Sequence, residues 1–162
     1  MTVATALDPA HLRRSFGAFP SGVTVIVGLA PDGTPLGLVA SSFTSVSLQP
    51  ALVSMCIAHT SGTWPLLTGL PVLGVSVLAA DQGWIARQVS ARRPDRFAGV
   101  EWRATADGAV VLDGASGWME VSVQQQIRAG DHDIVVLAVH ELNADPEMQP
   151  LVFHGSRFRQ LA

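Results

Sequence analysis

The sequence predicts a mainly β protein, folded as a closed or partly closed antiparallel barrel with two or three short helices. Three observations predict this class. About seven segments are rich in apolar and β-branched residues. Short turns join many of these segments, and the alternation of strands and helices that marks a parallel sheet is weak. The 162 residues contain no internal repeat or linker, so we expect a single domain over residues 1–162.

The first predicted element is a helix that begins after Asp8. This carboxylate is a good helix cap, and Pro9 suits the first helical position. Leu12, Phe16 and Phe19 follow at helical spacing and form a narrow apolar stripe. We expect this stripe to pack on the segment that comes next.

The next predicted elements are three strands. Residues 23–27 are dense in β-branched side chains, and residues 31–34 (Pro-Asp-Gly-Thr) are typical of a tight turn. The chain then returns as a second strand over residues 35–42. The third strand, residues 51–58, is apolar on both faces, so we expect it to be buried.

Two further helices and four strands complete the prediction. Ser61 or Thr63 caps a short helix over residues 64–67, and Asp81 caps a helix that carries Trp84 and Ile85. Residues 90–110 form a charged loop. The remaining strands are expected at 72–78, at 117–129, at 134–142 after a Gly130-Asp131 turn, and at 151–158.

Composition excludes several classes of function. All ten basic residues are arginine, so no lysine is present for a pyridoxal phosphate Schiff base or a phosphate-binding loop. There is no tyrosine to act as a phenolic acid or base. The net charge of −3 gives no general attraction for nucleic acid or an anionic membrane. The sequence also lacks the glycine motif of dinucleotide-binding folds, the nucleophile elbow of hydrolases and the ligand spacing of zinc sites.

The sequence also indicates a cellular compartment. The single cysteine, Cys56, has no partner for an intrachain disulfide, and we interpret it as a small buried hydrophobic residue rather than a nucleophile. Residues 1–8 lack the basic and apolar regions of a signal peptide. No apolar run reaches the roughly 18 residues of a membrane span. We therefore expect a cytoplasmic protein.

Two polar segments and an arginine cluster are candidates for binding. Residues 40–47 hold five hydroxyl side chains, which bind phosphate together with turn amides or else bond their own backbone. Residues 59–65 lead into the start of a helix. The free N–H groups of this helix start either bind an anion or a carbonyl, or the segment is an ordinary helix cap. Arg92, Arg93 and Arg96 either form a solvated loop or contact a phosphate.

A third polar segment places His132 between Asp131 and Asp133. Three interpretations are open. His132 could bind a metal together with His140, although no second spaced pair of ligands accompanies them. It could contact a substrate from the rim of a pocket, or it could be hydrogen-bonded by its neighbours in a tight turn.

Five segments, in their order and spacing, form a larger pattern: 19–25 (FPSGVTV), 37–50 (GLVASSFTSVSLQP), 61–66 (SGTWPL), 96–102 (RFAGVEW) and 130–132 (GDH). This pattern resembles the flavin reductase-like family of small FMN-binding split-barrel proteins. The resemblance runs from about residue 12 to residue 158, the expected core of the domain. It implies an antiparallel Greek-key split barrel and a homodimer, with flavin in a groove near the subunit interface.

The resemblance also implies which residues bind. Ser41 and Ser42 would hold the flavin phosphate and ribityl chain, while the turn at residues 21–23 and the strand ending at Ala58 would flank the isoalloxazine ring. His132 is carried over to nicotinamide binding as the candidate catalytic residue. The expected cofactor-binding residues are Ser21, Gly22, Val23, Ala40, Ser41, Ser42, Ser47, Cys56, Ala58, Ser61, Thr63, Trp64, Ser90 and Arg96.

The sequence departs from the family pattern at four places. Residues 49–51 (Gln-Pro-Ala) replace a commoner double proline plus leucine, and residues 89–90 stand where an aromatic residue is frequent. Ala138 takes a position often held by glycine. Asp133 sits where a threonine is usual, and it places a negative charge beside the expected dinucleotide site.

The function that the resemblance implies is an NAD(P)H-dependent flavin reductase. It would transfer a hydride from NADH or NADPH to FMN or FAD and supply a separate flavin-dependent monooxygenase. Such a transfer needs the nicotinamide stacked on the flavin, and it requires no acid, base or nucleophile from the protein. Two alternatives stay open: a flavin carrier or sensor without turnover, and an FMN-dependent oxidase of a small metabolite. No metal, nucleic acid or membrane is expected as a partner, and the sequence does not choose between the two flavins or the two coenzymes.

Overall fold

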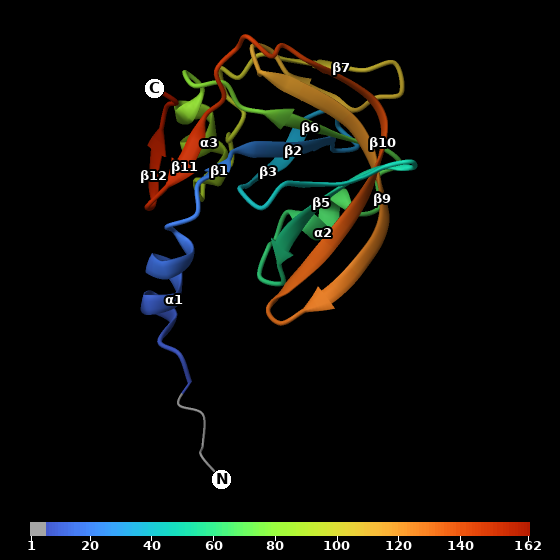
Figure 1. Ribbon diagram of the computed structural model, residues 1–162. Helices are drawn as coiled ribbons and strands as arrows, with labels where there is room; N and C mark the ends of the chain where they lie inside the picture. The colour runs from blue at the N-terminus through green and yellow to red at the C-terminus, as the bar shows by residue number, and fades with distance from the viewer. Residues whose placement is uncertain (1–5) are drawn as a thin grey trace.

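Seven antiparallel strands form the central sheet of the computed structural model, which describes residues 6–162 (Figure 1). They are β2 (Thr24–Leu29), β3 (Pro35–Ala40), β4 (Thr44–Leu48), β5 (Ala51–Ala58), β6 (Leu73–Val77), β9 (Gly117–Ala129) and β10 (His132–Ala144). Their order in the sheet is β3-β2-β6-β9-β10-β5-β4. Smaller sheets are formed by β1 (Ser21–Gly22), β11 (Val152–His154) and β12 (Arg157–Arg159), and by β7 (Trp102–Ala104) with β8 (Val110–Leu112).

The central sheet is bent along its two longest strands. β9 and β10 have 13 residues each, and their register shifts between Val136 and Leu137 and again between Val139 and Glu141. Such irregularities increase the local twist of a strand pair. The sheet is not closed, because β3 and β4 are its end strands. The expected mainly β, antiparallel architecture is confirmed.

Two apolar clusters fill the two sides of β2. Ile26 belongs to a cluster that includes residues of α2 (Trp64–Leu67), whereas Val25 and Val27 belong to one that includes residues of α3 (Gly83–Ser90). Successive side chains of a strand point to opposite faces, so β2 is buried on both sides. This double burial accounts for its unbroken apolar run.

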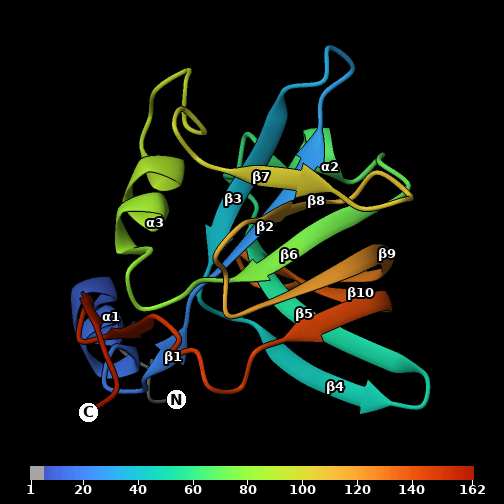
Figure 2. The same cartoon turned by 90° about the horizontal axis from the view of Figure 1, so that it is seen from above.

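Several elements follow the sequence prediction closely. The helix α1 (Pro9–Phe16) begins after Asp8, whose Oδ2 accepts a hydrogen bond from the His11 backbone N–H at 3.0 Å. The bounds of β5, β9 and α2 are those predicted. α1 lies at one corner with β1, β11 and the C-terminus (Figure 2).

The apolar stripe of α1 does not pack on the next segment, so this prediction is wrong. None of residues 9–16 is buried, and the side chains of Phe16 and Phe19 are 72% and 80% exposed. The helix projects away from the sheet (Figure 1). Helical spacing shows which residues share a face, but it does not show what covers that face.

The composition of β5 predicts burial on both faces, but only one face is buried. Val53, Met55 and Ile57 are buried, whereas Cys56 is an exposed free cysteine. The interpretation of Cys56 as a buried hydrophobic residue is therefore wrong. The second face of β5 opens onto a groove.

Three other elements or groups of elements differ from the prediction. The N-cap of α3 is Gln82 and not Asp81; the Gln82 side chain accepts from Ala79 N–H and donates to Asp113 O, so tertiary contacts fix this helix start. Strands β1, β4, β7 and β8 are absent from the prediction. The predicted last strand, 151–158, is instead the hairpin β11–β12, with Ser156 at a positive φ of 59°.

Within residues 6–162, no helix is both long enough and apolar enough to cross a membrane. Residues 1–5, on which the expectation about a signal peptide partly rests, lie outside the described residues.

Candidate functional site

A groove of about 320 Å³ lies where the ends of β3 and β5 meet the start of β10. It gathers residues that are far apart in the sequence, and many of them are predicted site residues. Its lining consists of Leu38, Val39, Ala40, Ser41, Ser42, Cys56, Ile57, Ala58, Ser61 and His132.

The lining of this groove fits a flavin. Leu38, Val39 and the small Ala58 provide an apolar wall, and the hydroxyls of Ser41 and Ser61 provide polar contacts at its margin. Ligand sites commonly combine apolar walls with a few polar groups that fix orientation. The flat ring of a flavin suits the apolar wall, and its phosphate suits the hydroxyl groups, so no lysine is needed.

Ser42 has a contact that also holds the fold together. Its Oγ accepts a hydrogen bond from the Cys56 backbone N–H at 2.8 Å and donates to the Cys56 carbonyl at 3.3 Å. These bonds tie the segment after β3 to β5. Because the single hydroxyl proton is used on the carbonyl, the Ser42 side chain offers a phosphate no further donor. Exposed Ser41 is the better-placed donor.

The loop between β5 and α2 positions more of the predicted residues. The N-cap residue of α2 is Thr63, whose side chain makes no capping hydrogen bond, while Ser61 Oγ accepts from the Trp64 backbone N–H at 3.1 Å. Arg96 donates from Nη2 to Thr63 Oγ1 at 3.0 Å and from Nη1 to the Val89 carbonyl at 3.1 Å. Thr63 and Arg96 therefore bind each other beside the loop and do not line the groove.

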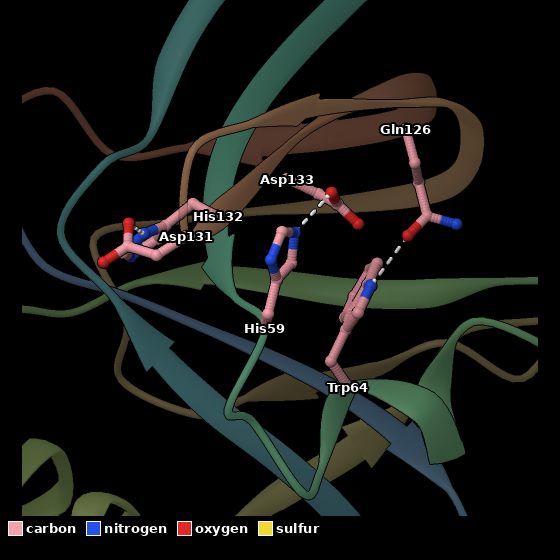
Figure 3. A network of polar contacts seen from close by, with 6 residues as sticks. All are labelled: His59, Trp64, Gln126, Asp131, His132 and Asp133. Carbon is pink, nitrogen blue, oxygen red and sulfur yellow. Dashed lines mark hydrogen bonds and ion pairs between the residues drawn. The ribbon is translucent and has the colours of Figure 1, made fainter.

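Two histidine–aspartate pairs stand at the end of the β5–β10 ladder (Figure 3). His132 Nδ1 lies 2.7 Å from Asp131 Oδ1, and His59 Nε2 lies 2.8 Å from Asp133 Oδ1. The hydrogen bond with His132, followed by their charge attraction, lowers the pKa of Asp131 below its ordinary value. An ionised Asp131 favours a proton on Nδ1 of His132, which leaves Nε2 of the neutral ring as an acceptor.

The His59–Asp133 pair and three wall residues (Leu38, Val39 and Ile57) are absent from the sequence prediction. The pair is separated by 74 residues, and no local motif signals it. It forms because the register of β10 on β5 places Asp133 opposite Ile57, two residues before His59. A correct strand register would have been the only signal.

The metal interpretation of His132 finds no support in the part of the chain that the structure describes. Within residues 6–162, no three His, Cys, Asp or Glu side chains form a group that could hold a metal ion. His140 Nε2 instead lies 2.7 Å from Ser122 Oγ.

A second groove of about 560 Å³ adjoins the first and shares Ser41 and His132 with it. It extends toward α1 and places predicted Ser21 beside these two residues. Its other lining residues are Arg13, Phe16, Gly17, Phe19, Phe153 and Ser156.

The remaining predicted binding residues line neither groove. Val23 is buried at 1% exposure, Gly22 lies in β1, Ser47 lies in β4, and Ser90 is the last residue of α3. Trp64 is also buried, with its Nε1 donating to Gln126 Oε1 at 2.9 Å. Their roles as ligand contacts stay predictions.

The charged loop after α3 satisfies part of its own charge. Arg93 Nε donates to Asp95 Oδ1 at 2.9 Å. This hydrogen bond lowers the pKa of Asp95 and raises the pKa of Arg93. Both side chains remain largely in solvent.

Comparison with known proteins places this architecture in a family. A family model described as a flavin reductase like domain matches residues 16–162. The chain belongs to the flavin reductase-like family. This finding confirms the family and, with the structural neighbours, the split-barrel fold that the sequence predicts.

Three similar proteins illustrate the family. The solved structure of the NADH:FAD oxidoreductase SgcE6 from Streptomyces globisporus, with NAD and FAD fragments, is 37% identical, covers 98% of each chain and has a TM-score of 0.89. The flavin-dependent monooxygenase reductase subunit HsaB of Rhodococcus jostii is 33% identical over 96% of this chain and 79% of its own length. A probable flavin reductase of Rhizobium meliloti is 39% identical over 82% of this chain, and this chain covers only 43% of that protein. These flavin reductase-like relatives bear out the expectation of an NAD(P)H-dependent flavin reductase.

Proposed function

We propose that this protein transfers a hydride from a nicotinamide coenzyme to FMN or FAD in the groove between β3, β5 and β10. One observation carries the proposal: the Ser41-Ser42 segment, Ala58 and His132 meet on a single groove in a flavin reductase-like chain. The flavin ring would lie on the apolar wall with its phosphate near Ser41. The nicotinamide would lie near His132.

The protein's own groups position the two ligands. Flavin supplies the hydride-accepting chemistry when it is bound. His132 Nε2, with the proton held on Nδ1 by Asp131, accepts a hydrogen bond from an amide such as that of nicotinamide. The hydroxyl groups of Ser41 and Ser61 at the groove margin would favour the negative charge that reduction places on a flavin. Near contact of the two rings is the remaining requirement, and binding of both in one groove would bring them together.

Within this function we propose NADH as the preferred coenzyme. The Asp131 carboxylate lies beside His132 at the margin of the groove, and a coenzyme with the additional phosphate of NADPH brings more negative charge to this groove. In the charged loop after α3, Arg93 bonds Asp95 and Arg96 bonds Thr63, so these two arginines do not offset this charge. The S. globisporus relative is an NADH:FAD oxidoreductase, which agrees with this preference.

We also propose that reduced flavin leaves for a separate flavin-dependent monooxygenase, as the name of the R. jostii reductase subunit supports. Residues 1–162 are proposed to act as one domain within a homodimer. The exposed Phe16 and Phe19 beside the second groove support the dimer. A cytoplasmic location is proposed because the exposed lone thiol of Cys56 suits a reducing compartment.

The test is coenzyme oxidation by the purified protein with NADH or NADPH and excess FMN or FAD, in all four pairings. We expect turnover with at least one flavin, and faster turnover with NADH than with NADPH. His132→Ala should raise the KM for the coenzyme by about tenfold, the effect of losing one hydrogen bond of typical strength. Oxidation no faster than the background in every pairing would contradict the proposed function.

A further inference from the structure

The end of the β5–β10 ladder has two faces with different contacts. His132 stands opposite Ala58, and both line the groove. Asp133 stands opposite Ile57 and, because side chains alternate along a strand, points to the other face. There its Oδ1 lies 2.8 Å from His59 Nε2 (Figure 3). The His59–Asp133 pair therefore lies behind the part of the wall that carries His132.

The tip of the β9–β10 hairpin is held by backbone pairing, which reaches His132, and by contacts with the loop after β5. Strand β5 ends at Ala58, opposite His132, and residues 124–131 of the hairpin are all exposed. His59 contacts the tip twice: its backbone N–H donates to the Asp131 carbonyl at 2.9 Å, and its ring bonds Asp133. The two paired side chains are 34% and 28% exposed, so water reaches their contact only in part.

The loop that carries His59 is itself held in place. Trp64, 6% exposed, donates from Nε1 to Gln126 Oε1 at 2.9 Å, and its backbone N–H donates to Ser61 Oγ. Ser61 on the groove wall thus has anchors independent of Asp133. Loss of the His59–Asp133 contact would loosen the hairpin tip with His132 more than it would move Ser61.

We propose that His59 and Asp133 form a positioning pair, which fixes His132 at the coenzyme end of the groove. Neither residue is part of the groove lining, so both act through His132. The inference rests on the proposed function, because the coenzyme is the ligand assigned to His132. A misplaced His132 weakens coenzyme binding, while flavin keeps its contacts with the Ser41 segment and the β5 wall.

Four variants test the pair: His59→Ala, Asp133→Ala, Asp133→Asn and the double variant His59→Ala/Asp133→Ala. Each alanine variant should raise the coenzyme KM about five- to tenfold, with the flavin Kd changed less than about twofold. Asp133→Asn keeps an acceptor oxygen and should restore most of the affinity. The double variant should be no worse than either single variant, because a broken pair has no second contact to lose.

Asp107→Ala removes an exposed aspartate from the turn between β7 and β8 and is the matched control, expected to behave as the parent. Unchanged coenzyme KM in the alanine variants, or additive effects in the double variant, would overturn the pairing. So would a lower kcat with both Michaelis constants unchanged, which is the signature of a merely structural role.

A second readout separates this inference from the proposed function. In the flavin-free protein, His59→Ala should shift the imidazole NMR signals of His132, although the two residues are distant in sequence. If the parent oxidises no coenzyme, the proposed function fails and the NMR result alone decides on the pair. Shifted His132 signals then support the positioning role, and signals at the parent positions overturn it.

Discussion

At the residue scale, the carboxyl group of Asp131 reports on its contact with His132. The hydrogen bond from His132 is the largest cause of the lowered pKa of Asp131. Because the pKa of Asp131 is lower in the folded protein, this carboxyl group stabilises the fold at pH values above its ordinary pKa of 3.8. This contribution is lost as the pH falls through the lowered pKa. Asp131 is therefore ionised throughout the neutral range, where it orients the His132 ring.

His132→Ala should accordingly raise the pKa of Asp131 toward its ordinary value. NMR titration of the side-chain carboxyl carbons measures this change. Asp32 is an internal control, because Thr34 and not a histidine lowers its pKa. We expect the titration of Asp32 to be the same in parent and variant. If the pKa of Asp131 stays low in the His132→Ala variant, another group and not His132 causes the shift.

The sequence identifies the site residues that stand in local motifs. Ser41, Ser61 and His132 each belong to a short polar segment that follows or begins a strand or helix, and all three line the groove. The contact between His59 and Asp133 is invisible at this level, because it depends on the register of two strands. The sequence does not show the two hydrogen bonds of Ser42 to Cys56 either, because they depend on how the segment after β3 lies against β5.

At the scale of elements, prediction succeeds where burial and length leave a clear pattern. Strand β9 and helix α2 have the expected bounds because turn residues and caps delimit them. The short strand β7, by contrast, has three residues and lies in segment 90–110, whose charge indicates a loop, and β8 begins at the last residue of that segment. For β7, pairing with β8 and not the local composition makes a strand.

The contact between β6 and β8 gives a prediction at this scale. A Cβ on Gly74 would overlap the backbone carbonyl group of Val110, which belongs to β8. Gly74→Ala should lower the free energy of unfolding by about 3 kcal/mol, because a strand and not a flexible side chain must move. Denaturant titration measures the loss. Gly69→Ala is the control, since its Cβ would meet nothing within 4 Å, and equal stability of the two variants would contradict this packing.

At the scale of the whole molecule, the corner at α1 presents an apolar surface that the described part of this chain leaves open to solvent. Phe16 and Phe19 are 72% and 80% exposed, and both line the groove that shares Ser41 and His132 with the flavin site. Burying such aromatic side chains contributes strongly to association. The same surface would bring a second subunit close to the coenzyme end of the site.

Phe19→Asp should therefore convert a dimer into a monomer, because the interface would have to bury an unpaired charge. Sedimentation equilibrium measures the change. Leu142→Asp is the matched control: Leu142 is 60% exposed, belongs to β10 and lines neither groove, so this variant should remain dimeric. A monomeric parent, or a dimer that Leu142→Asp dissociates and Phe19→Asp does not, would place the interface elsewhere. If the dimer also completes the site, Phe19→Asp will weaken coenzyme binding together with association, and raising the protein concentration until dimers reform will restore it.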